Sequence, residues 1–99
     1  RELYVDAAFI SCSGFSEDGI VNTGSSGSAL KSIMLENAQR RFLLADYTKY
    51  NSQGLYFLSD WSGIDVLITD RAPAEEMSRI LQRSGVSVLI GDGAFSSGL

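Results

Sequence analysis

The chain has 99 residues, the size of one small domain; 44% are hydrophobic and 20% are charged, which is ordinary for a soluble globular protein. A net charge of −4 argues against a nucleic-acid-binding surface, because such a surface presents clustered lysine and arginine to phosphates. With one cysteine and no histidine, the chain cannot form an intrachain disulfide and lacks the usual ligands of structural zinc. We therefore expect no metal and no other cofactor.

No apolar run approaches the length of a membrane span, and no signal peptide opens the chain. A lone cysteine also fits a reducing compartment. These features predict a cytoplasmic protein with no membrane partner. The chain starts without methionine, in residues that resemble the beginning of a strand, which indicates a fragment of a longer protein.

The first expected strand covers residues 3–10, which are rich in β-forming side chains. Asp6 interrupts this run, so the buried part of the strand should begin after it. The chain then leaves the sheet through small residues at 11–14, and there Gly14 lets a backbone or a ligand come close. A turn at residues 16–19 follows, with Gly19 available for a positive φ.

A glycine- and serine-rich segment at residues 23–28 precedes an expected helix. One apolar stripe at helical spacing consists of Leu30, Ile33, Met34 and Ala38. Free N–H groups at such a helix start bind anions, although the segment matches no complete phosphate-binding motif. Alternatively, Ser25 or Ser28 simply caps the helix. Lys31 is expected in the first turn, where the helix dipole disfavours a cation, and this mismatch hints at a function.

A short buried strand at residues 42–44 is followed by Asp46 and, within one turn, by Lys49. Ligands collect at the carboxyl ends of strands in open α/β sheets, so an acid and a base placed there could hold a polar ligand. The two side chains could equally pair with each other. Spacing alone favours that simpler interpretation.

Residues 55–58 form either a short strand or a turn of helix, and the pattern does not decide between them. In the loop that follows, Trp61 is expected to anchor the loop rather than to bind a ligand. Residues 64–69 are rich in branched side chains and predict another strand.

A well-marked helix follows, with Pro73 at its first position and Gly85 past its end. Its buried face is expected to consist of Met77, Ile80 and Leu81. Residues 87–90 predict the last strand, and residues 91–99 a loose tail. Because helices alternate with buried strands, we expect an α/β fold with a largely parallel sheet, right-handed crossovers and helices on both faces.

Four sequence blocks stand in order along the chain. They are Val5-Asp6-Ala7-Ala8-Phe9-Ile10 with Gly14 and Gly19, Lys31 before Ile33-Met34, Ala45-Asp46-Tyr47-Thr48-Lys49-Tyr50, and Ile64-Asp65-Val66-Leu67-Ile68-Thr69-Asp70. They resemble the blocks D-x-A-F-I-G-x-x-G, V-K-x-x-M, A-D-x-[ST]-K-[FY] and I-D-x-[LV]-I-T-D of the effector domain in DeoR-family bacterial transcriptional repressors. Any one block is weakly specific, whereas four in order are fairly specific.

The resemblance implies a domain that senses a phosphorylated sugar or related metabolite, with a fold similar to ribose-5-phosphate isomerase and the CoA-transferases. Residues 1–90 would be the later part of this domain. DNA would be contacted only through an N-terminal helix-turn-helix module that the chain does not contain, and the full-length protein would be a homo-oligomer. The chain departs from the pattern at Ser11, where glycine is usual, and at residues 24–28, where many members carry acids.

Residue chemistry and resemblance together predict a ligand site with five members, which are Asp6, Gly14, Lys31, Asp46 and Lys49. The two lysines suit an anionic ligand, and either aspartate could accept hydrogen bonds from hydroxyls. Other interpretations stay open. Asp6 could only satisfy a loop amide, Lys31 could be solvated, and Lys49 could pair only with Asp46.

The alternative function is a sugar-phosphate isomerase, which shares the fold and needs a carboxylate base beside the substrate. Related isomerases carry D-G-A-D after the first strand, where this chain reads Ile10-Ser11-Cys12-Ser13, and an acid close to the position of Lys31. A phospho-receiver module would need paired acids after the same strand to hold a metal. Because these carboxylates are missing, we predict that the chain is not an enzyme. Cys12 is expected to be a small buried residue and not a nucleophile.

Overall fold

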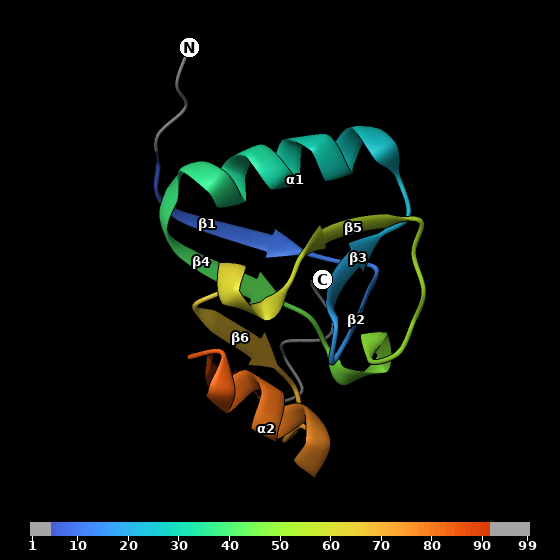
Figure 1. The fold of residues 1–99 in the computed structure, drawn as a ribbon, viewed down its shortest axis with the longest axis vertical. Coiled ribbons are helices and arrows are strands. Elements are labelled where there is room, and N and C mark those ends of the chain that lie inside the picture. Colours follow the sequence, from blue (N-terminus) through green and yellow to red (C-terminus); the bar gives the residue numbers. More distant parts are fainter. Residues whose placement is uncertain (1–4, 92–99) are drawn as a thin grey trace.

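Two sheets and two helices make up the fold in the computed structural model, which describes residues 5–91, apart from the side chain of Ser26. The main sheet has the order β1 (Val5–Ser11), β4 (Ala38–Leu44), β6 (Val66–Thr69) and β7 (Ser87–Ile90), with every pair parallel. The second, antiparallel sheet has the order β2 (Gly14–Ser16), β3 (Gly19–Asn22) and β5 (Tyr56–Ser59). Two helices, α1 (Ser25–Asn37) and α2 (Glu75–Arg83), and two 3-10 turns, η1 (Tyr47–Lys49) and η2 (Trp61–Gly63), complete it (Figure 1).

The inner face of the main sheet carries the core. Ile10, Leu43 and Leu67 stand in register on neighbouring strands, and all three side chains are buried. The cluster around them includes Leu35 of α1 together with Met77 of α2. The mostly parallel α/β fold predicted from the sequence is thus confirmed, and both helices contribute to the core of one face.

The strand order explains why the helices share a face. From β1 to β7 the chain steps across the sheet in one direction, so each right-handed crossover returns on the same side. The sequence predicted helices on both faces. Within residues 5–91, the helix layer covers only the face of Ile10 and Leu43.

The opposite face of the sheet is apolar and open within the described residues. Phe9 is 59% exposed and Leu89 is 55% exposed. The rings of Phe9 and Phe42 stack with centroids 4.4 Å apart, and the Arg40 guanidinium lies 5.1 Å from the Phe42 ring. Such a face differs from the usual parallel sheet, which is covered on both sides.

Helix α1 differs from its prediction in start and in phase. It begins at Ser25 with Gly24 as the N-cap residue and no side-chain cap, so neither proposed serine caps it. Lys31 therefore lies in the second turn, not the first. The predicted stripe is wrong as well, because Leu30 is 57% exposed and Ile33 is 45% exposed.

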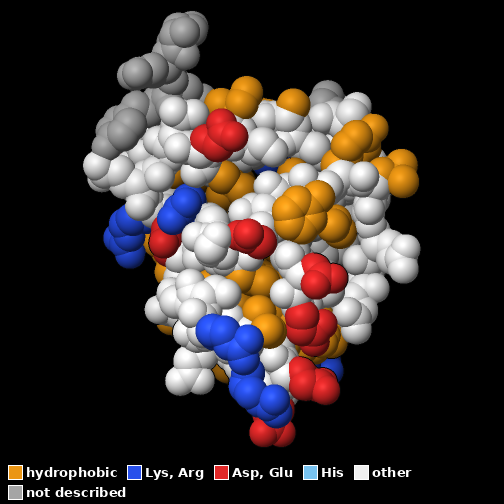
Figure 2. Space-filling view, viewed as in Figure 1, with side chains coloured by type: hydrophobic (Ala, Val, Ile, Leu, Met, Phe, Trp, Pro, Cys, Tyr) orange, Lys and Arg blue, Asp and Glu red, His pale blue; other side chains and the backbone are white. Residues whose placement is uncertain are grey.

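The inner side of α1 instead carries Ser28 and Leu35, which are both buried. Lys31 shares this side, and its amino group reaches Ser11 on β1. This side of the helix therefore combines core packing with a polar contact, and some apolar side chains of the helix face outward. Figure 2 shows apolar side chains exposed over α1 and over the neighbouring β5.

The hairpin of β2 and β3 is an element that the sequence pattern did not reveal, because its strands are only three and four residues long, too short for an alternating pattern. Its turn was predicted, and Gly19 has a φ of 138°. Gly14 is required by a close approach, since a Cβ there would lie 2.0 Å from the Ser52 carbonyl oxygen. The ambiguous stretch after residue 54 forms β5, which pairs with β3.

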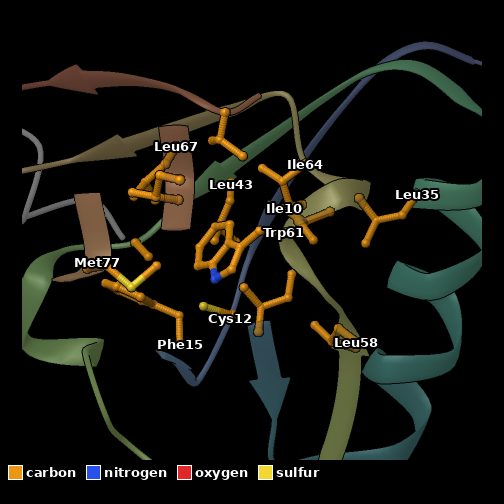
Figure 3. Packing of buried hydrophobic residues seen from close by; sticks show 14 residues of the cluster. Ile10, Cys12, Phe15, Leu35, Leu43, Leu58, Trp61, Ile64, Leu67 and Met77 are labelled. Atoms are coloured by element: carbon orange, nitrogen blue, oxygen red, sulfur yellow. The ribbon is translucent and has the colours of Figure 1, made fainter. Parts of the chain in front are cut away.

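Trp61 anchors its loop as predicted. The indole is buried at the centre of the core, among Leu43, Ile10 and Cys12 (Figure 3). Its Nε1 donates to the Ser16 carbonyl oxygen at 2.7 Å. The core therefore holds the hairpin by a directed bond as well as by packing.

The end of the chain follows the prediction closely. Helix α2 starts at Glu75 after Ala74, so Pro73 precedes the helix instead of opening it. Gly85 has a φ of 80°, as expected past a helix end, and the last strand is confirmed as Ser87–Ile90. The expected tail at residues 91–99 lies, apart from Gly91, outside the residues that the structure describes.

We expect Gly14→Ala to lower the free energy of unfolding by about 1–3 kcal/mol, because a methyl group cannot fit against the Ser52 backbone without a shift. The control is Gly27→Ala in α1, where the added Cβ meets only Asn22 Nδ2 at 3.7 Å. That change should stabilise the helix by about 0.5–1 kcal/mol. Urea unfolding of both variants measures the difference, and equal stabilities would contradict the close approach.

Candidate functional site

A cavity of about 360 Å³ opens at the carboxyl ends of β1 and β4. Its lining consists of Ser11, Cys12, Ser13, Leu44, Ala45, Asp46 and Lys49. Two neighbouring parallel strands end here, and open α/β sheets bind ligands beyond the carboxyl ends of their strands. The cavity therefore has the position expected for a ligand site.

The turn η1 forms one wall of the cavity, and Asp46 fixes its start. The Asp46 carboxylate accepts from the Thr48 backbone N–H at 3.0 Å and also from the Thr48 hydroxyl. The hydroxyl bond is the main reason that the pKa of Asp46 lies below its usual value. The Tyr47 N–H donates to Asp70 at 2.8 Å, which ties the turn to the end of β6. Asp46 is thus a negative charge held in one orientation.

Lys49 brings a cation to the same wall. Its Nζ lies 4.0 Å from Asp46 Oδ2, and both side chains are partly exposed. A contact at that distance between partly solvated groups is a weak ion pair. The predicted pairing of Lys49 with Asp46 is therefore present, and it leaves the ammonium open to a further partner.

Lys31 approaches the cavity from α1. Its Nζ donates to the Ser11 carbonyl oxygen at 2.7 Å and lies 3.5 Å from Asn22 Oδ1. The Ser13 hydroxyl donates to the same Asn22 oxygen at 3.1 Å. Lys31 is consequently not simply solvated, because it joins α1 to the segment that follows β1.

The Cys12 thiol is close enough to both lysines for their charges to affect its pKa. Burial raises the pKa of its thiol to about 11, and the positive charges of Lys31 and Lys49 both act in the opposite direction. The fields of both cations thus reach the same point of the cavity wall. As expected, Cys12 is buried, and a thiol with this pKa stays protonated at neutral pH.

The other two predicted site residues do not line the cavity, although the Gly14 backbone bonds to the Cys12 thiol in its wall. Asp6 stands near the amino end of β1, about 16 Å along the strand from Ser11 at a rise of roughly 3.3 Å per residue. Gly14 lies against the Ser52 backbone and does not line the cavity. Asp46 and Lys49 thus line the cavity together, Lys31 reaches it through the Ser11 carbonyl oxygen, and Asp6 lies far from all three.

Sequence reasoning missed the polar residues that hold the site together, which are Ser13, Asn22 and Asp70. Asn22 lies on a short strand that had no clear pattern, so its contact with Lys31 depends on the fold. Asp70 ended a recognised block, and its position after β6 was the available signal. Among the described residues, no group of three or more acidic or cysteine side chains could hold a metal. No helix within residues 5–91 is long and apolar enough to cross a membrane.

Comparison with known families decides the relationship. A family model described as the DeoR C terminal sensor domain matches residues 1–71. The chain belongs to this family. The resemblance drawn from the four sequence blocks is thereby confirmed, and Lys31, Asp46, Lys49 and Asp70 all lie within the matched residues.

Two of the similar proteins are named as HTH-type transcriptional regulators. The HTH-type transcriptional repressor GlcR of Bacillus subtilis (strain 168) is 36% identical over 87 residues, which are 88% of this chain and 34% of that protein. The uncharacterized HTH-type transcriptional regulator YgbI of Escherichia coli (strain K12) is 32% identical over 90 residues, 91% of this chain and 35% of that protein.

The L-fucose operon activator of Haemophilus influenzae (strain ATCC 51907 / DSM 11121 / KW20 / Rd) is 25% identical over 91 residues, which are 91% of this chain and 36% of that protein. The chain thus spans about a third of the length of the curated relatives that it matches.

We expect Thr48→Ala to raise the pKa of Asp46 toward 3.8, because the lost hydroxyl bond is the largest cause of its lowered pKa. A carboxylate with a lowered folded-state pKa stabilises the fold above the unfolded-state pKa and loses that contribution as the pH falls through the folded-state pKa. The stability difference between parent and variant should therefore shrink below about pH 4.

Carboxyl NMR titration of Asp46 measures the shift directly. Ser62→Ala is the matched control, because Asp60 caps η2 through Ser62 in the same way as Asp46 caps η1 through Thr48. That variant should leave the Asp46 titration unchanged. An Asp46 pKa that does not move in Thr48→Ala would rule out the hydroxyl as its cause.

Proposed function

We propose that this chain is the effector-sensing part of a DeoR-family bacterial transcriptional repressor, and that the cavity between β1 and β4 binds a phosphorylated sugar or a related metabolite. The observation that carries the proposal is the pair of Asp46 and Lys49 in the cavity wall, with the Lys31 ammonium bonded to the carbonyl oxygen of Ser11, which also lines the cavity. Lys31 comes from α1, while Asp46 and Lys49 come with η1. The fields of both lysines act on Cys12 in the cavity wall.

The charges match the two ends of such a ligand. A phosphoryl group accepts charge-assisted hydrogen bonds from an ammonium, and Lys49 has only a weak ion pair to give up. Sugar hydroxyls donate to carboxylates, and Asp46 Oδ2 faces the same space as Lys49. The whole chain has a net charge of −4, but the lysines at this cavity favour an anionic ligand there.

Recognition without turnover is the role that the lining supports. The segment after β1 contains Cys12 between two serines and supplies no carboxylate to move a proton between carbons. Asp46 has a lowered pKa and accepts two hydrogen bonds from Thr48, which makes it a poor general base near neutral pH. We therefore propose a sensor and not an isomerase.

The regulatory step is a population shift. Ligand binding favours one arrangement of the effector domains, which changes the spacing of the helix-turn-helix modules that contact the operator. A ligand achieves this only if its affinity differs between the two arrangements. The proposal includes a homo-oligomeric full-length protein in the cytoplasm, with DNA contacted through its N-terminal module.

A thermal-shift screen of the full-length protein against sugar phosphates tests the ligand class, since a ligand of the folded state raises stability by mass action. Stabilisation by a sugar phosphate, but not by the parent sugar, would support the proposal. No stabilisation by any phosphorylated sugar would count against it.

We expect Lys49→Ala in the full-length repressor to weaken effector affinity roughly ten- to a hundredfold, because a lost charge-assisted hydrogen bond costs about 1.5–3 kcal/mol. Operator binding without effector should stay largely intact. Arg83→Ala on the exposed side of α2 is the control and should bind effector like the parent. Unchanged affinity with a small drop in melting temperature would mean that Lys49 only pairs with Asp46.

A further inference from the structure

The phenol of Tyr50 connects η1 to the β2–β3 hairpin. Tyr50 directly follows Lys49, and its hydroxyl donates to Glu17 Oε2 at 2.5 Å. Glu17 lies in the turn between β2 and β3, 33 residues earlier in the chain. Figure 1 shows η1, after β4, beside the turn end of this hairpin. The bond thus joins the element that carries Lys49 to a separate sheet.

One short turn cannot hold its own position. Within η1 the Lys49 N–H donates to the Asp46 carbonyl oxygen and the Tyr50 N–H to that of Tyr47, and no residue of the turn is buried. At its start, η1 is tied through Tyr47, whose N–H donates to Asp70 and whose hydroxyl accepts from the Ala74 N–H. These bonds hold the Tyr47 side of the turn.

The Lys49 side is tied to the hairpin instead. Besides the phenol bond to Glu17, the Asn51 N–H donates to the Phe15 carbonyl oxygen at 2.7 Å. Asn51 has a φ of 61°, a conformation that few non-glycine residues adopt and that asparagine tolerates. The chain therefore turns sharply after Tyr50 and is fixed there against β2.

The Tyr50 ring and the Tyr50 hydroxyl have separable contacts. The ring centroid lies 5.6 Å from that of Phe15 and 4.9 Å from that of Tyr47. The hydroxyl contacts Glu17. Removing only the oxygen leaves the ring packing in place, so the polar bond is testable without opening the aromatic cluster.

We propose that Glu17 and Tyr50 are positioning residues of the effector site, and that their hydrogen bond holds η1 so that Lys49 points at the ligand. This proposal rests on the function proposed above. The bond raises the pKa of Tyr50 to about 12, so the phenol remains a donor at neutral pH. Neither side chain lines the cavity of Asp46 and Lys49, so both act through Lys49.

The test uses the full-length protein and titrates ribose 5-phosphate, with inorganic phosphate as the simplest anionic probe. Tyr50→Phe should weaken binding of the probe about three- to tenfold, the effect of one lost hydrogen bond. Glu17→Ala should do the same, and Glu17→Gln should recover part of the affinity because its amide oxygen still accepts. Tyr56→Phe, at a partly exposed tyrosine of β5, is the control and should bind like the parent.

A double-mutant cycle separates positioning from general loss of stability. Because Tyr50 acts through Lys49, Tyr50→Phe should have no further effect on affinity in a Lys49→Ala background. An equal effect in both backgrounds, or parent-like binding by Tyr50→Phe while Lys49→Ala binds weakly, would overturn the positioning role alone. If the parent binds neither probe, or if Lys49→Ala binds both probes as tightly as the parent, the proposed site itself is wrong. The positioning role then falls with it.

Discussion

Burial of the Trp61 indole is the constraint on which the rest of the structure depends. The side chain fills the core between the main sheet and the hairpin, and its one N–H reaches the Ser16 carbonyl oxygen. A buried indole N–H without a partner costs free energy, so the hairpin is held where that carbonyl can accept. The next residue, Glu17, is then placed to accept from Tyr50. Core packing thus sets the position of a polar residue beside the candidate site.

The main sheet places the site at its edge because its inner face is filled. Ile10 and Leu43 are buried side by side, and the cavity starts just beyond them, where the chain leaves both strands. There, polar backbone and charged side chains replace apolar packing. Lys31 belongs to both regions, since its stem lies on the inner side of α1 while its ammonium ends at the Ser11 carbonyl oxygen. Lys31 therefore joins α1 to β1 and brings a positive charge to Ser11 at the cavity.

Sequence patterns were sufficient where a local cause decides the structure. The last strand at Ser87–Ile90, the positive φ of Gly85 and the anchoring role of Trp61 follow from short-range periodicity, turn chemistry and side-chain type. The hairpin and the phase of α1 depend on partners far along the chain, such as Ser52 over Gly14 and Ser11 at Lys31. For the site, adjacency in one sequence block predicted that Asp46 and Lys49 lie together. The expected strand at residues 3–10 already placed Asp6 well before its carboxyl end, so the local pattern itself argued against Asp6 at that edge.

The turn η1 is where the proposed sensing has its physical basis. A ligand changes an equilibrium only through contacts that differ between two arrangements of the protein. Lys49 lies between two tyrosines whose hydroxyls bond to different elements. The Tyr47 hydroxyl accepts from the Ala74 N–H before α2, and the Tyr50 hydroxyl donates to Glu17 in the hairpin. A ligand that fixes Lys49 therefore also restricts the distance between these elements. A single 3-10 turn has few internal hydrogen bonds, so its geometry depends on the bonds that Tyr47 and Tyr50 make to other elements. By linkage, a ligand bound at Lys49 changes the stability of those same bonds.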